Sequence, residues 1–113
     1  MSNLLFICSR NQWRSPTAEK VFKQKGFSAR SAGTSPNARK SVSVADIKWA
    51  NIIFVMEKKH KNRIIAKFTR LVEHKPIYIL DIPDEYKFMD SELISHLEDA
   101  VEPFLAELTS KKS

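Results

Sequence analysis

Two scarcities limit what this protein can be: the chain has a single cysteine and no long apolar run. Because Cys8 is the only cysteine among 113 residues, an internal disulfide framework is excluded. A lone cysteine also suits a reducing compartment, and we expect a cytoplasmic protein. No apolar run approaches the length needed to cross a membrane, and residues 4–7 are too few for the core of a signal peptide, so no membrane partner is expected.

Metal ligands and domain boundaries are scarce as well. His60, His74 and His96 are widely spaced and form no metal-ligand pattern with Cys8, so the sequence predicts neither a metal site nor a cofactor. No repeat, linker or low-complexity segment divides the chain, whose length suffices for one hydrophobic core and not for two. We therefore predict a single domain over residues 1–113.

Acidic residues are scarce only in the first two thirds of the chain. Residues 1–75 contain 4 Asp and Glu against 16 Lys and Arg, whereas residues 76–113 contain 9 against 3, which leaves the net charge at +6. Basic residues around a binding site would attract anionic substrates, and nucleic acid is then among the candidate partners. The alternative is that one basic cluster is only the solvated face of a helix, namely Lys58, Lys59, Lys61, Arg63 and Lys67.

The remaining pattern alternates strand and helix. We predict strands near 3–8, 27–31, 51–56 and 76–80, and helices near 15–25, 57–68 and 90–109. Strands that are apolar on both faces favour a four-stranded parallel sheet with helices on both sides, which is a three-layer α/β fold. Ligands of such sheets bind beyond the carboxyl ends of the strands, where Cys8 and the segment 81–86 are expected.

The first helix has the sharpest predicted boundaries. Ser15 suits the N-cap, Pro16 the first helical position and Gly26 the residue just past the end. The N-terminus of this helix then faces the loop that follows Cys8. Backbone N–H groups that curl around a helix N-terminus form a concave site for a dianion such as phosphate.

Cys8 and Arg14 place a nucleophile and a cation at the two ends of this loop. The planar guanidinium of Arg14 suits two phosphoryl oxygens, in the bound state and in the transition state. The loop dipoles, Arg14 and the Ser15 hydroxyl favour the thiolate of Cys8, which makes it a nucleophile near neutral pH. The alternative is that Cys8 is a small buried hydrophobic residue, the commoner role of a lone cysteine after an apolar run.

The segment CSRNQWRSPTAE at residues 8–19 resembles the signature loop of the low-molecular-weight protein tyrosine phosphatase family. Downstream, SAGT at 31–34 resembles the second strand and turn of that family, and Ala45-Asp46 with residues 52–57 resembles its third strand. The segment IPDEY at 82–86 is similar to its Asp-Pro-Tyr acid loop. The resemblance covers most of residues 4–105. It implies a flavodoxin-like fold and an enzyme that hydrolyses phosphomonoesters through a phosphocysteine intermediate.

Three residues depart from the family pattern. Arg10 stands where the family commonly has glycine, which limits the loop backbone and adds a second cation near the phosphate. Trp13 stands where a second cysteine is common, so Cys8 has no partner for a protective disulfide, and its oxidation should run to sulfenic and higher acids. Glu85 replaces the proline after the acid aspartate, which leaves the orientation of Asp84 open.

The resemblance completes the set of candidate residues. Asp84 is expected to protonate the leaving group and then activate water, with Asp81 at the end of the fourth strand as its competitor. Tyr86 and Trp13 are expected to flank an aromatic ester, the alternative being ordinary packing, and Asn11 is expected to hold a left-handed turn. The predicted catalytic residues are Cys8, Arg14 and Asp84, and the predicted substrate-binding residues are Ser9, Arg10, Asn11, Gln12, Trp13, Ser15 and Tyr86.

The predicted function is that of a phosphoric monoester hydrolase, specifically a protein tyrosine phosphatase whose partner is a phosphorylated protein. Three alternatives stay open: a phosphatase of nucleic-acid or small-molecule phosphates, a non-catalytic module that binds phosphoprotein or nucleic acid, and a phosphocysteine carrier of the sugar phosphotransferase type. An arsenate reductase on the same scaffold would need further cysteines to relay a disulfide, and this chain has only one.

Overall fold

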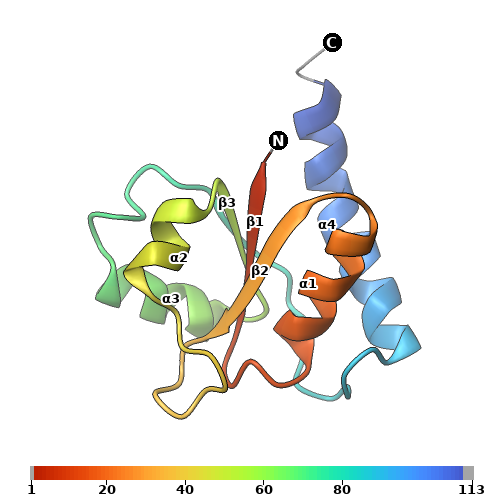
Figure 1. Cartoon of the computed structure of the whole chain (residues 1–113), viewed down its shortest axis with the longest axis horizontal. Coiled ribbons are helices and arrows are strands. Elements are labelled where there is room, and N and C mark those ends of the chain that lie inside the picture. The colour runs from red at the N-terminus through yellow and green to blue at the C-terminus, as the bar shows by residue number, and fades with distance from the viewer. Residues whose placement is uncertain (1, 111–113) are drawn as a thin grey trace.

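The structure is a computed structural model that describes residues 2–110. Its parallel sheet contains β1 (Asn3–Cys8), β2 (Ser28–Gly33), β3 (Ile52–Val55) and β4 (Ile77–Ile79), in the order β2-β1-β3-β4. Helices α1 (Arg14–Gln24) and α4 (Ser91–Ser110) cover one face, and α2 (Val44–Trp49) and α3 (Lys58–Lys67) cover the other (Figure 1). The predicted three-layer α/β fold with four parallel strands is confirmed, and its strand order is that of flavodoxin-like sheets.

The two faces of the sheet divide the hydrophobic core into two layers. In β1, Leu4, Phe6 and Cys8 belong to the layer under α1 and α4, whereas Leu5 and Ile7 belong to the layer under α2 and α3. All five side chains are buried. The unbroken apolar run at the start of the chain therefore reflects burial on both faces of a central strand.

Parallel pairing brings the carboxyl ends of the strands to one edge of the sheet. Cys8 at the end of β1 pairs with Gly33 at the end of β2, and Val55 at the end of β3 pairs with Ile79 of β4. The segments that follow these strands lie together at the lower edge of the sheet in Figure 1. Residues 9–13, 34–43 and 80–86 are thereby placed around one point, as expected for a parallel sheet.

Helix α1 begins differently from the prediction. Its N-cap is Trp13, no side chain caps it, and Ser15 lies inside its first turn. The hydroxyl of Ser15 lies 3.0 Å from the Cys8 sulfur and does not accept from a helix N–H group, so the cap prediction for Ser15 is wrong. Pro16 was predicted at the first helical position, which is also wrong, because the helix begins at Arg14 and Pro16 is its third residue. The predicted end is confirmed, because Gly26 follows the helix with a φ of 95°.

Helix α2 was not predicted from the sequence. A capping box begins it: the Ser43 hydroxyl accepts from the backbone N–H of Asp46 at 3.2 Å, and the Asp46 carboxylate accepts from the backbone N–H of Ser43 at 3.2 Å. Ala45 and Asp46, which the resemblance grouped with the third strand, therefore lie in a helix. None of the helices within residues 2–110 is long and apolar enough to cross a membrane.

Candidate functional site

Residues 9–13 wrap around the sulfur of Cys8, and we call residues 8–15 the Cys8 loop. The backbone N–H of Asn11 donates to the sulfur at 3.3 Å, and the Ser15 hydroxyl lies 3.0 Å from it. Ser15 Oγ accepts from Asn11 Nδ2 at 3.0 Å, and its own hydrogen has two acceptors in reach, the Cys8 sulfur at 3.0 Å and the Ala32 carbonyl at 3.5 Å. Cys8 is only 3% exposed, and both polar groups next to its sulfur lie on the loop that follows it.

The tight turn of the Cys8 loop lies at Asn11. This residue has a φ of 57° and is 1% exposed. Its Nδ2 also donates to the Ser31 hydroxyl at 2.9 Å, and Ser31 in turn donates to Glu19 at 2.5 Å. Arg10 has no positive φ, so the loop does not require glycine at that position. The side chain of Asn11 thus ties the loop to α1 and β2.

Glu19 ends this chain of hydrogen bonds as a carboxylate. Burial opposes its charge, but hydrogen bonds from Lys23 and Ser31 outweigh burial and hold the pKa of this carboxyl below its usual value. An ionised Glu19 accepts from Ser31, which leaves the Ser31 oxygen to accept from Asn11. The direction of every hydrogen bond from Glu19 to the loop is therefore determined.

The segment after β2 supports the Cys8 loop from the other side. A side chain at Gly33 would place its Cβ 2.5 Å from the carbonyl oxygen of Ser9, so only glycine allows this close approach. Arg39 Nε donates to the Asn11 carbonyl at 3.1 Å. Three backbone N–H groups donate to three carbonyls of the loop at 2.9–3.0 Å: Thr34 to Cys8, Ser35 to Ser9, and Arg39 to Arg10.

Arg14 is buried and connects the Cys8 loop to two other segments. Its Nη1 donates to Glu57 Oε1 at 2.5 Å and to the carbonyl of Ile82 at 2.8 Å, and its side chain is 2% exposed. Its Nε lies 3.7 Å from a carboxylate oxygen of Asp84, whose side chain is 60% exposed. Burial opposes the charge of Glu57, but the hydrogen bond from Arg14 outweighs it and lowers the pKa of Glu57.

The two candidate acids are placed differently. Asp84 reaches Arg14 at the rim of the Cys8 loop. Asp81 lies two residues past the end of β4 with a φ of 55° and is exposed, and among the side chains of residues 2–106 it has no ion pair or hydrogen bond. The structure therefore brings Asp84, and not Asp81, to Arg14 of the Cys8 loop.

His60 at the start of α3 is buried against the Cys8 loop. Its Nδ1 accepts from the backbone N–H of Glu57 at 3.0 Å, so its proton is on Nε2, which donates to the Ser9 hydroxyl at 2.8 Å. Burial and the nearby charge of Arg14 lower the pKa of His60 to about 4. His60 is thus a neutral donor at neutral pH that positions the first residue after Cys8.

The remaining predicted binding residues lie on the outer side of the loop. The side chains of Arg10, Gln12 and Trp13 are exposed, and Trp13 is 41% exposed. Tyr86 is half-buried against the core layer under α4, and its ring centroid lies 5.8 Å from that of His96. The structure therefore leaves Trp13 accessible and gives Tyr86 a packing contact.

Sequence reasoning missed the residues that hold the loop from a distance. Glu57 lies two residues past the end of β3, so the rule that ligands gather at the carboxyl ends of parallel strands could have identified it. No functional role was predicted for His60, yet it is buried with a specific hydrogen-bond partner. No local signal in the sequence marks Ser31 or Glu19 as partners of Asn11.

Similarity to known proteins is found in structure and not in sequence. No protein-family model and no curated protein matches this sequence. The YwlE arginine phosphatase from Geobacillus stearothermophilus superposes with a TM-score of 0.78 at 20% identity, over 99% of this chain and 96% of that one. For SP-PTP, a low molecular weight protein tyrosine phosphatase from Streptococcus pyogenes, the TM-score is 0.78 at 19% identity, over 96% and 93%. The tyrosine phosphatase Wzb from Escherichia coli K30, solved in complex with phosphate, gives 0.76 at 20% identity, over 96% and 99%.

The chain has the fold of the low-molecular-weight protein tyrosine phosphatases. This confirms the predicted resemblance at the level of the fold. Within the low-molecular-weight phosphatase fold of this chain, the Cys8 loop follows the first strand and the segment with Asp84 follows the fourth. The alignments cover 93% or more of the length of each of these three matched chains.

Proposed function

We propose that this protein is a phosphomonoester hydrolase of the low-molecular-weight protein tyrosine phosphatase family with Cys8 as its nucleophile. One observation carries the proposal: the Cys8 sulfur receives the Asn11 N–H at the centre of a loop that ends in the buried cation Arg14. A cysteine that served only for packing would need neither contact. The exposed Asp84 beside Arg14 adds a proton donor at the rim.

The loop offers donors for the three non-bridging oxygens of a phosphoryl group. Within residues 2–110, the backbone N–H groups of Arg10, Gln12 and Trp13 donate to no other residue. Unpaired N–H groups around a helix N-terminus are suited to an oxyanion. Arg14 uses Nη1 for Glu57 and Ile82, which leaves its Nε–Nη2 edge to bind two oxygens side by side.

The reaction proceeds in two displacements at phosphorus. The Cys8 thiolate attacks, the S–P bond forms and the bond to the leaving oxygen breaks, while Asp84 gives its proton to that oxygen. Asp84 then takes a proton from water, the water oxygen attacks phosphorus, and the S–P bond breaks. Inorganic phosphate is released and the Cys8 thiolate is regenerated. Neither displacement changes an oxidation state, and protons and bonds balance with water as the only co-reactant.

Phosphotyrosine in a protein is the substrate we propose. The exposed indole of Trp13 lies next to Arg14 in sequence and can stack on an aromatic ring above the loop. Two of the similar structures are described as tyrosine phosphatases and one as an arginine phosphatase, so phosphoarginine is the substrate to compare first. End-phosphorylated nucleic acid is the third substrate to compare, because Arg10 is exposed on the Cys8 loop and the chain has a net charge of +6.

The test is hydrolysis of p-nitrophenyl phosphate by the wild type, Cys8→Ser and Arg14→Lys. Wild-type turnover with no turnover above background for Cys8→Ser is expected, and Arg14→Lys should lose at least about a hundredfold because it cannot bind two oxygens in one plane. Equal rates for the wild type and Cys8→Ser would refute the proposal. Tight binding of a phosphopeptide or a phosphorylated RNA without hydrolysis would support the non-catalytic alternative instead.

A further inference from the structure

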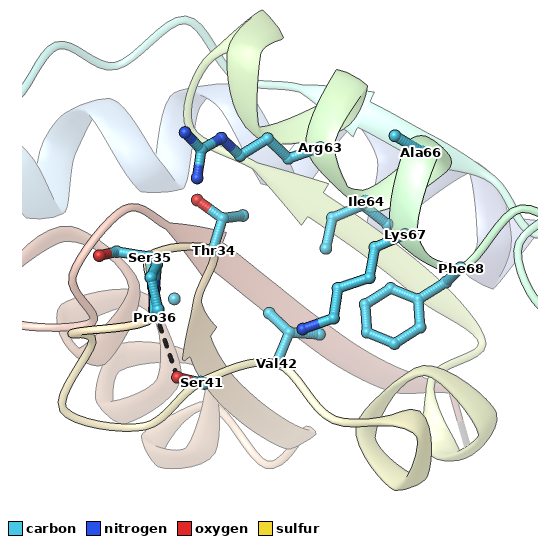
Figure 2. Close-up of a pocket in the computed structure, with 11 residues that line it drawn as sticks. Thr34, Ser35, Pro36, Ser41, Val42, Arg63, Ile64, Ala66, Lys67 and Phe68 are labelled. Atoms are coloured by element: carbon cyan, nitrogen blue, oxygen red, sulfur yellow. Dashed lines mark hydrogen bonds between the residues drawn. The ribbon is translucent and has the colours of Figure 1, made fainter.

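A pocket of about 430 Å³ lies next to the Cys8 loop, between the segment after β2 and helix α3 (Figure 2). Its floor is apolar and belongs to the core layer under α2 and α3, with Val42, Ile64 and Phe68 each less than 8% exposed. A pocket of this size and lining is large enough for a side chain or a small ligand. None of the proposed catalytic residues lines it.

The pocket adjoins the catalytic loop through two shared elements. Thr34 and Ser35 line the pocket and donate their backbone N–H groups to the carbonyls of Cys8 and Ser9. On α3, His60 contacts Ser9, and the pocket-lining residues begin one helical turn further along, at Arg63. Since each turn rises 5.4 Å, the pocket extends from about 5 to about 11 Å along α3 from that contact.

Two cations stand at the rim of this apolar floor. In Figure 2, Arg63 extends toward Thr34, and Lys67 extends across the opening toward Val42. Both are exposed, and among the side chains of residues 2–106 neither has a carboxylate within 4.0 Å. The Lys67 ammonium lies 5.5 Å from the centroid of the Phe68 ring, over the pocket floor. An apolar cavity beneath positive charges that no carboxylate neutralises is complementary to an apolar group that lies beside a negative one.

We propose that this pocket is a substrate subsite that binds an apolar side chain next to an acidic residue in the phosphoprotein. The proposal rests on the proposed phosphatase function. An extended peptide rises about 3.3–3.6 Å per residue, so the pocket corresponds to one to three residues from the phosphorylated one. A tethered peptide fits better than a free ligand because the pocket wall is continuous with the loop that binds the phosphate.

The experiment compares three synthetic phosphotyrosine peptides of equal length. The first has leucine and glutamate within three residues on both sides of the phosphotyrosine, the second replaces glutamate by lysine, and the third replaces leucine by serine. For the wild type, kcat/KM should fall about fivefold from the first peptide to the second. It should fall about tenfold from the first to the third, because the apolar contact is lost.

Two variants test the pocket directly, and one is the matched control. Lys67→Glu should reverse the preference between the glutamate and lysine peptides. Ala66→Trp fills the pocket from an exposed position and should remove the preference for leucine over serine. Lys61→Glu makes the same charge change on the other side of α3, where Lys61 lines a separate surface with Ile65 and Thr69, and it should keep the wild-type preference. All three variants should retain wild-type turnover of p-nitrophenyl phosphate.

The outcomes separate the subsite from the phosphatase proposal. If p-nitrophenyl phosphate is hydrolysed but the three peptides are equivalent, or if Lys67→Glu acts no more strongly than Lys61→Glu, the subsite is refuted and the phosphatase proposal stands. If no phosphoester is hydrolysed, the phosphatase proposal fails, and the dissociation constants of the same peptides for the Cys8→Ser protein decide the subsite. No measurable binding of any peptide would also refute it.

Discussion

The Cys8 loop and the segment with Asp84 lie at the same edge of the sheet but are held very differently. In the Cys8 loop, Asn11, Arg14 and Ser15 are each at most 2% exposed, and hydrogen bonds connect the loop to α1, β2 and α3. The side chain of Asp84 is 60% exposed, and its carboxylate Oδ1 lies 3.7 Å from Arg14 Nε. The rigidly held Cys8 loop is suited to a phosphoryl group, whose shape is the same in every substrate. The exposed Asp84 is suited to protonating leaving groups that differ between substrates.

Arg14 is where the two regions meet. One nitrogen of its guanidinium donates both to Glu57 beyond β3 and to the carbonyl of Ile82 beyond β4. The position of the acid segment therefore depends on a residue of the Cys8 loop. Variants in the two regions should show different combinations of lost rate and lost stability, and the expected effects are given from the largest to the smallest.

Asp84→Asn should affect the chemistry and not the fold. Loss of the proton donor should lower kcat for p-nitrophenyl phosphate by about 10²–10⁴-fold. Because the side chain is mostly exposed, the urea midpoint of unfolding should stay unchanged. Asp81→Asn is the matched control and should retain the wild-type kcat; an equal loss in both variants would contradict the assignment of the acid.

Asn11→Ala should affect both rate and stability. The substitution removes the hydrogen bonds to Ser15 and Ser31 and forces alanine into a left-handed turn. We expect about a hundredfold loss of kcat/KM from the misplaced loop and a loss of about 2 kcal/mol in the free energy of unfolding. Asn11→Gly keeps the turn and should recover part of the stability; a rate loss without any loss of stability would show that the turn is not structural.

The buried His60 should make stability depend on pH. Its pKa is about 4 in the folded protein and 6.5 in the reference state, so the unfolded chain binds the proton more readily. Neutral His60 contributes to the free energy of unfolding above pH 6.5, and this contribution is lost as the pH falls toward 4. The wild type should lose about 2 kcal/mol of unfolding free energy between pH 6.5 and pH 5, measured by urea denaturation. His60→Gln should flatten this dependence, and an equal slope in both proteins would contradict the assignment.

Glu57→Gln should give the smallest effect. The variant keeps the shape of the side chain but replaces a charge-assisted hydrogen bond to Arg14 by a neutral one. The guanidinium is then held less firmly, and the inhibition constant of inorganic phosphate should rise about fivefold. Phosphate inhibition that is unchanged or tighter would show that Glu57 only neutralises Arg14 and does not orient it.

Local patterns allowed much of the fold to be predicted. The apolar run of β1, the Gly26 stop of α1 and the alternation of strands and helices each depend on neighbours in sequence, and each is confirmed. Helix α2 was missed although Ser43 and Asp46 have the spacing of a capping box, because the segment is only six residues long.

The contacts that hold the site depend on distant parts of the chain. The N-cap prediction for Ser15 failed because its hydroxyl lies against the Cys8 sulfur, a partner seven residues away. The pairs Ser9–His60 and Arg14–Glu57 join residues 51 and 43 positions apart. Such pairs follow from sheet register, which the sequence alone does not determine. The roles of Cys8, Arg14 and Asp84 stay predictions that activity measurements must decide.

The most direct test of the central claim is to look for a phosphoryl group on the Cys8 sulfur. Asp84→Asn protein, which should hydrolyse the intermediate slowly, is mixed with p-nitrophenyl phosphate, quenched within one turnover and digested for mass spectrometry. The account predicts a phosphorylated peptide that contains Cys8, formed together with a burst of p-nitrophenol and absent from Cys8→Ser. Turnover by the wild type with no phosphoryl group on Cys8 at any quench time in Asp84→Asn would contradict it.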